Sequence, residues 1–155
     1  MSSLVDLDGE PARTLHASFD QVTLRVSGGK PIRLRAELLA EATSRTPGAT
    51  LWQELLLYHS DADEYAVGLT TCRSLAGSND VFHARVFAQL EQALAWLQDF
   101  DPTADLGVEL DVSDRRISTT DIALRAAALR QRADRVELQY STMIGELMFR
   151  LDLEG

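Results

Sequence analysis

Cysteine is nearly absent from this sequence, with Cys72 the single example in 155 residues. One thiol excludes the disulfide framework that small secreted domains often need, and it favours a reducing compartment. No run of apolar residues approaches the ~18 needed for a membrane-spanning helix. The first residues also carry Asp6, Asp8 and Glu10 where a secretory signal would have its apolar core. We therefore expect a cytoplasmic protein without a membrane segment.

Lysine is almost as rare, because fourteen of the fifteen basic residues are arginine. This bias is typical of GC-rich bacterial genomes and indicates a bacterial source. The net charge is −9, and residues 1–113 hold 8 basic and 17 acidic side chains, whereas residues 114–155 hold 7 of each. Such an acidic field disfavours binding to nucleic-acid phosphates or to anionic lipid, so we expect neither partner.

Motifs of the common enzyme classes are also missing. The sequence has no G-x-S-x-G nucleophile elbow, and Cys72 lacks the flanking residues of a thiol enzyme. The segment SGGK, residues 27–30, lacks the spacing of a phosphate-binding loop. We therefore expect no cofactor and favour a protein without catalytic activity, and an unusual active site stays open as the alternative.

What the sequence does contain is a series of short segments with period-two alternation, which predicts β-strands. In residues 19–39, Val22, Leu24 and Val26 alternate with polar residues before the turn SGGKP. The alternating run after this turn places four apolar residues on one side, namely Ile32, Leu34, Ala36 and Leu38. We expect these two strands to form a hairpin with one solvent-exposed face.

A second hairpin is predicted at residues 51–72, where Asp61, Ala62 and Asp63 form a polar turn. Both faces of its strands are mostly apolar, which is typical of strands in the middle of a sheet. We therefore place this hairpin centrally and expect a covering layer on each face. Residues 81–87 are expected to form a fifth strand.

An amphipathic helix is predicted after the fifth strand. Apolar residues recur at helical spacing before Pro102 ends the pattern, namely Leu90, Ala93, Leu94 and Leu97. The segment ADLGVELDVSD, residues 104–114, is expected to add a short edge strand.

The strongest periodic signal lies near the C-terminus. From Ser118 to about Leu151 the sequence predicts one long helix, and the Ser118 hydroxyl is placed to accept from the Asp121 amide in a capping box. Apolar residues repeat at alternating spacings of four and three, namely Ile122, Ala126, Leu129, Ala133, Val136, Tyr140, Met143 and Leu147. A rival interpretation ends the helix near Asp134 and folds the remaining chain into a hairpin around Gly145.

This apolar stripe is also a candidate dimer seam. A helix of ~34 residues spans ~50 Å and a strand only ~20 Å, so the helix should extend beyond the sheet of its own chain. The mean spacing of about 3.5 residues is that of a coiled coil, and the small Ala126 and Ala133 permit close approach. We therefore expect a homodimer, and the alternative is a monomer whose chain bends near Gly145.

The predicted fold class is α+β, with an antiparallel sheet of about five strands followed by an amphipathic helix and a long C-terminal helix. We expect residues 1–15 to be a mobile N-terminal segment and residues 16–112 to form the sheet with its packed helix. Residues 113–155 are expected to hold the long helix, which is the candidate dimerisation element.

Five side chains are candidates for lining a ligand pocket, and the alternative for each is ordinary core or surface packing: Trp52, Tyr58, Tyr65, His83 and Arg85. The segment HSDAD offers His59, Asp61 and Asp63 as metal ligands. Three ligands from one turn make an incomplete site, and Asp is independently favoured in turns, so we expect no metal.

The one concentration of basic residues is RQRADR, residues 130–135. Asp134 and Glu137 are interleaved with Arg130 and Arg135, and no aromatic platform accompanies them. This pattern is typical of a solvated helix flank rather than a nucleic-acid interface. The missing catalytic motifs and the long apolar seam together favour a non-catalytic interaction or regulatory protein that acts as a homodimer. The alternative is a small-molecule-binding protein or small enzyme with a pocket between the sheet and the helices.

Overall fold

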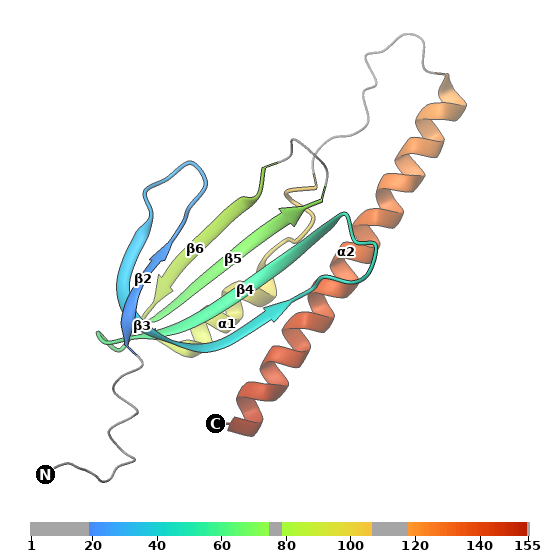
Figure 1. Ribbon diagram of the computed structural model, residues 1–155. Helices are drawn as coiled ribbons and strands as arrows, with labels where there is room; N and C mark the ends of the chain where they lie inside the picture. Colours follow the sequence, from blue (N-terminus) through green and yellow to red (C-terminus); the bar gives the residue numbers. More distant parts are fainter. Residues whose placement is uncertain (1–18, 75–78, 107–117, 155) are drawn as a thin grey trace, which may run out of the picture. The chain divides into compact units, whose positions relative to one another are not determined.

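The computed structural model describes residues 19–74, 79–106 and 118–154. The expected mobile segment at residues 1–15 and most of the expected edge strand at residues 104–114 lie outside this range. Seven elements follow in chain order: β2 (Asp20–Leu24), β3 (Ile32–Thr43), β4 (Leu51–Ser60), β5 (Tyr65–Arg73), β6 (Val81–Phe87), α1 (Leu90–Asp99) and α2 (Thr119–Glu154). The predicted α+β class, with five antiparallel strands, a short helix and a long C-terminal helix, is confirmed (Figure 1).

The five strands form one sheet in the order β2-β3-β4-β5-β6, so each strand pairs with its neighbours in sequence. The strand β4 is the third of five, which confirms that the second hairpin lies in the middle of the sheet. In the first hairpin, Asp20 pairs with Ala36 and Leu24 with Ile32. The turn between these strands uses Gly28 at φ 76°, a conformation that favours glycine.

The two faces of β4 differ in burial. One face is entirely buried and consists of Leu51, Gln53, Leu55 and Leu57. Buried Gln53 has hydrogen-bond partners for its side chain and its backbone. Its side-chain Nε2 donates to the Pro102 carbonyl at 3.1 Å, and its backbone N–H donates to Ser44 Oγ at 2.8 Å. On the other face Glu54 is exposed and Tyr58 is half-buried. We expected both faces of β4 to be covered, and only one of them is fully buried.

The described residues divide into two compact units. Unit 1 holds the described residues of Met1–Glu41, Leu55–Leu69 and Phe82–Ala95. Unit 2 holds those of Ala42–Glu54, Thr70–Val81 and Trp96–Gly155, including all of α2 that the structure describes.

In unit 1, the first hairpin covers part of the second face of the central strands. The side chain of Leu24 is buried and lies over Gly68, where an added Cβ would come within 3.1 Å of Leu24 Cδ2. The Ser27 amide donates to the Phe82 carbonyl at 2.9 Å, and the Phe82 amide donates to Ser27 Oγ at 2.8 Å. These contacts join the end of the first hairpin to β6 and bury Leu24 between them and β5.

In unit 2, the second part of α2 packs against the end of α1. The Tyr140 hydroxyl donates to the Leu97 carbonyl at 2.6 Å, and the Tyr140 ring lies 5.7 Å from the ring of Phe100. The side-chain Nε2 of Gln139 donates to Thr46 Oγ1 at 2.9 Å. Helix α2 continues without a break to Glu154, so the rival interpretation with a terminal hairpin is wrong. Among the described residues no helix is long and apolar enough to cross a membrane.

Candidate interaction surface on the C-terminal helix

The seam of α2, defined as Ile122, Ala126, Leu129, Ala133, Val136, Tyr140, Met143 and Leu147, changes its surroundings halfway along the helix. Its last four residues, from Val136 onward, are buried, and Leu147 is 0% exposed. Its first four residues, from Ile122 to Ala133, are only half-buried although they lie on the same side of the helix. Among the described residues, the apolar seam therefore continues for about four turns beyond its fully buried part.

The N-terminal half of α2 is a well-formed helix despite this incomplete cover. The Asp121 amide donates to the Ser118 hydroxyl at 3.1 Å, which confirms this part of the predicted capping box. Four arginines flank the first half of the seam, against acidic Asp121 and Asp134: Arg125, Arg130, Arg132 and Arg135. Most of these charged side chains are exposed, as the predicted solvated flank requires, whereas Arg132 is half-buried.

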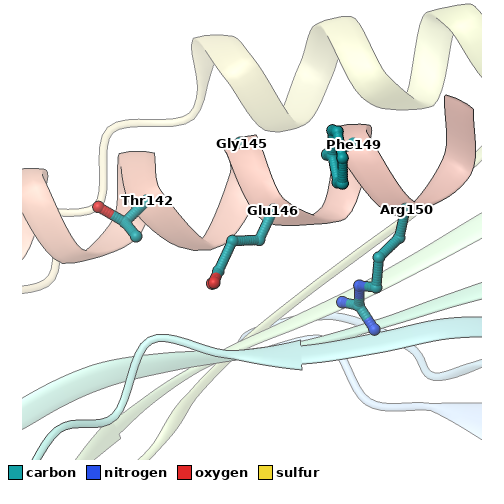
Figure 2. Close-up of a pocket in the computed structure, with 5 residues that line it drawn as sticks. All are labelled: Thr142, Gly145, Glu146, Phe149 and Arg150. Atoms are coloured by element: carbon teal, nitrogen blue, oxygen red, sulfur yellow. The ribbon is translucent and has the colours of Figure 1, made fainter. Parts of the chain in front are cut away.

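The outward side of α2 carries a second set of large apolar residues. Leu124, Leu138 and Phe149 are 64%, 68% and 65% exposed, although each is large and apolar. Near Phe149 the helix surface is hollowed, with a volume of about 540 Å³ lined by Thr142, Gly145, Glu146, Phe149 and Arg150. Figure 2 shows these residues on consecutive turns of α2, with Glu146 and Arg150 extending from neighbouring turns.

The hollow follows from one small residue. Gly145 has no side chain, and an added Cβ would meet no atom within 4 Å. The Thr142 hydroxyl donates to the Leu138 carbonyl at 2.9 Å. The residues Leu138, Thr142, Gly145 and Phe149 share the four-three-four spacing of the seam, but the threonine and glycine interrupt its apolar pattern. That spacing is the signal that was available in the sequence.

The five predicted pocket residues are not gathered at this hollow, and they belong to different units. Trp52 lies in unit 2, is buried, and donates its indole N–H to Glu54 Oε2 at 3.1 Å. The other four lie in unit 1, where Tyr58, Tyr65 and His83 are half-buried and Arg85 is exposed. Burial and the nearby Glu41 raise the pKa of Tyr58, so its phenol stays neutral.

The turn HSDAD is held by its own side chains. His59 Nε2 lies 2.8 Å from Asp63 Oδ1, and the His59 ring stacks on Tyr65 at 4.9 Å between centroids. Asp61 instead lies 3.7 Å from the Arg35 guanidinium. Asp63 adopts φ 61°, a left-handed conformation that Asp tolerates in turns. Within the described ranges, no three His, Cys, Asp or Glu side chains come close enough together to hold a metal ion.

The thiol of Cys72 is poorly suited to nucleophilic chemistry. Cys72 is buried on β5, and burial, followed by the negative charges of Glu54 and Asp80, raises its pKa to about 11. At neutral pH such a thiol is almost wholly protonated, and the thiolate is the reactive form. Cys72 is therefore a small apolar core residue in this fold.

Comparison with protein-family models, curated proteins and solved structures finds no match to this chain. Function has to be inferred from the described residues themselves. Among them, the feature with the clearest chemical character is the half-buried first half of the α2 seam.

Proposed function

We propose that this protein is a non-catalytic interaction or regulatory protein that acts as a homodimer through the N-terminal half of α2. The observation that carries the proposal is the change in burial along one helix face. From Val136 onward the face is buried, whereas Ile122, Ala126, Leu129 and Ala133 continue it and are only half-buried. A second helix that removes apolar residues at coiled-coil spacing from water lowers the free energy of the pair.

The net charge of the N-terminal half of α2 does not add to the attraction between two copies. This segment carries more basic than acidic residues, and a two-fold dimer brings it against its own copy. The association therefore depends on the apolar residues. The buried thiol of Cys72 supports a role without nucleophilic catalysis by this residue.

The mass of the protein in solution tests this proposal. We expect multi-angle light scattering to give twice the 17.1 kDa chain mass at high protein concentration, decreasing toward 17.1 kDa on dilution. Leu129→Asp should yield a folded monomer, because it places a charge in the first half of the seam. Leu124→Asp is the matched control, since Leu124 lies in the same turns but is 64% exposed on the outward side.

A wild-type mass of 17.1 kDa over the whole concentration range would overturn the dimer. Equal loss of the dimer in Leu124→Asp and Leu129→Asp would place the interface on a different side of α2. Far-UV circular dichroism of both variants confirms that any change in mass is not caused by unfolding.

A further inference from the structure

We infer that one face of the first hairpin binds an extended acidic segment of a partner protein. This surface, the basic hairpin face, is defined by four exposed cations: Arg25, Lys30, Arg33 and Arg35. It belongs to unit 1, whereas α2 belongs to unit 2. The inference therefore goes beyond the proposed dimer and does not depend on it.

The first hairpin concentrates positive charge within an acidic chain. Four of the eight basic residues in residues 1–113 lie between residues 25 and 35. Residues 21–36 contain no acidic residue, although the chain has a net charge of −9. The hairpin is therefore a local positive patch that attracts negatively charged groups at short range.

The strand register places two of these cations on one face of the hairpin. Thr23 of β2 lies opposite Arg33 of β3, and Gln21 lies opposite Arg35. Opposite residues of an antiparallel pair point to the same face, and so do alternate residues along one strand. All four of these side chains are exposed. This face therefore presents two guanidinium groups beside a hydroxyl and an amide, which can add hydrogen bonds to a bound segment.

The arginines at the two ends of this surface are held by their own chain. The Arg35 guanidinium lies 3.7 Å from Asp61 and donates to the Phe19 carbonyl at 3.1 Å, so its charge is partly compensated. The Arg25 guanidinium carbon lies 4.1 Å from the centre of the Phe82 ring. A guanidinium group stacked on a ring can still donate hydrogen bonds in its own plane.

The charge near the turn is uncompensated. Within the described ranges, neither Lys30 nor Arg33 has an acidic side chain within ion-pair distance. Carboxylates of a partner can therefore pair with these two groups without displacing an existing ion pair. Arginine also matches a carboxylate with two parallel hydrogen bonds, which favours Asp and Glu side chains as ligands.

The spacing of the cations favours an extended partner segment. Arg33 and Arg35 are two residues apart on β3, a separation of about 6.6 Å. Alternate side chains of an extended peptide have the same separation. A segment with an acidic residue at every second position therefore places one carboxylate near each guanidinium group.

Nucleic acid fits this surface less well than an acidic protein segment. Residues 20–36 contain no aromatic residue on which a base could stack. A long polyanion also extends beyond the patch by more than the Debye length of about 8 Å at physiological salt, where the acidic remainder of the chain repels it. A short acidic segment contacts the patch without this repulsion.

Fluorescence anisotropy with a labelled peptide of alternating aspartate and threonine tests the inference. A peptide of alternating asparagine and threonine is its neutral control. We expect the full chain to bind the aspartate peptide alone at low salt, and an ionic strength of about 1 M to abolish the binding, because the Debye length is then about 3 Å. Lys30→Glu combined with Arg33→Glu should weaken binding by about tenfold or more, since two attractive charges become repulsive.

The matched control is Arg125→Glu combined with Arg130→Glu, which changes the net charge equally at two exposed arginines of α2. It should bind the aspartate peptide like the wild type. Lys30→Arg combined with Arg33→Lys keeps both charges and should also retain binding. Equal weakening in the two glutamate double variants would overturn the inference, because net charge rather than the basic hairpin face would then determine binding.

Two further outcomes would overturn the inference. One is absence of binding of the aspartate peptide by the folded wild-type chain at low salt. The other is tighter binding of a single-stranded oligothymidylate that the Lys30 and Arg33 glutamate variant loses, which would make nucleic acid the partner of this surface. Circular dichroism confirms that each variant is folded. The dimer mass is measured separately, so either conclusion can fail without the other.

Discussion

The two halves of α2 have the same apolar spacing and different surroundings. In the second half, Val136, Tyr140, Met143 and Leu147 are buried by their own chain, whereas the corresponding residues of the first half are not. The halves differ in side-chain size, because two of the four seam residues in the first half are alanine. A seam of large residues fills the space against a folded unit, and a seam that alternates large with small residues suits another helix. Side-chain size therefore distinguishes a seam that packs within its own chain from a seam that suits a second helix, although both have the same apolar spacing.

Polar contacts reinforce this difference. The second half is fixed by the Tyr140 hydroxyl on the Leu97 carbonyl and by Gln139 on Thr46. At the other end, the Ser118 cap belongs to the same helix and stabilises it locally without joining it to the rest of the chain. We therefore expect substitutions in the second half to affect folding and substitutions in the first half to affect association.

The largest contrast should come from one charge placed in each half. Met143→Asp introduces a carboxylate at a buried position, and we expect it to lower the free energy of unfolding by about 4 kcal/mol or more, enough to unfold much of the protein. Leu129→Asp should change the unfolding of the isolated monomer by less than about 1 kcal/mol, since Leu129 is half-buried. Urea unfolding followed by circular dichroism, at concentrations where both variants are monomeric, measures the difference.

Leu138→Asp is the control for Met143→Asp, because Leu138 lies in the same half of α2 and is 68% exposed. It should remain close to wild type in stability. If Met143→Asp and Leu138→Asp lower the free energy of unfolding by the same amount, the second half of α2 is not packed against the rest of unit 2. The comparison between the two halves of α2 then fails.

A smaller effect is expected from Tyr140→Phe, which removes one hydroxyl and leaves the Leu97 carbonyl without this donor. We expect a loss of about 1–2 kcal/mol at pH 7. Burial raises the pKa of Tyr140 in the folded protein, while in the unfolded chain the phenol ionises near pH ~10. The stabilisation from Tyr140 is therefore fully present below pH ~10 and decreases as the pH rises further. The difference between wild type and Tyr140→Phe should narrow above pH ~10.

Urea unfolding of both proteins at several pH values checks this expectation. Comparison with the variant is needed because Tyr58 and Cys72 also have raised pKa values and weaken the fold at alkaline pH. A constant difference between wild type and variant up to pH ~11 would contradict a neutral, hydrogen-bonded Tyr140.

Much of the sheet could be predicted because local signals in the sequence agree with the fold. Alternation defined the strands, turn residues such as Gly28 and Asp63 separated them, and the doubly apolar β4 indicated a central position. The long helix could be predicted for the same reason, since its cap at Ser118 and its seam both follow from residues three or four apart. Short-range rules succeed where neighbouring residues determine the structure.

Features that depend on distant residues were less predictable. Leu38 was expected on the inner side of its hairpin and is 48% exposed. Leu38 lies on the same strand as the buried Ala36, so alternation along β3 does not determine how far each apolar residue is covered. Cover by distant parts of the chain determines it, and no local pattern in the sequence indicates that cover.

The candidate site was predictable in part for a similar reason. The seam was found from its spacing, but which half the chain covers depends on Leu97 and Thr46, which lie far from α2 in the sequence. The hollow at Gly145 was missed because a glycine and a threonine on the outward side look like ordinary surface residues.

The smallest predicted effect is a gain in stability, from Gly145→Ala on the outward side of the second half. Gly145 lies inside a helix, where alanine is favoured over glycine by about 1 kcal/mol, and an added Cβ meets no atom within 4 Å. We expect the midpoint of urea unfolding to rise, because the second half of α2 unfolds together with unit 2. Gly68→Ala is the matched control, and it should be destabilising because its Cβ would come within 3.1 Å of Leu24 Cδ2. A loss of stability in Gly145→Ala would show that another part of the protein occupies the hollow, and the outward side of α2 would then join the seam as a covered surface.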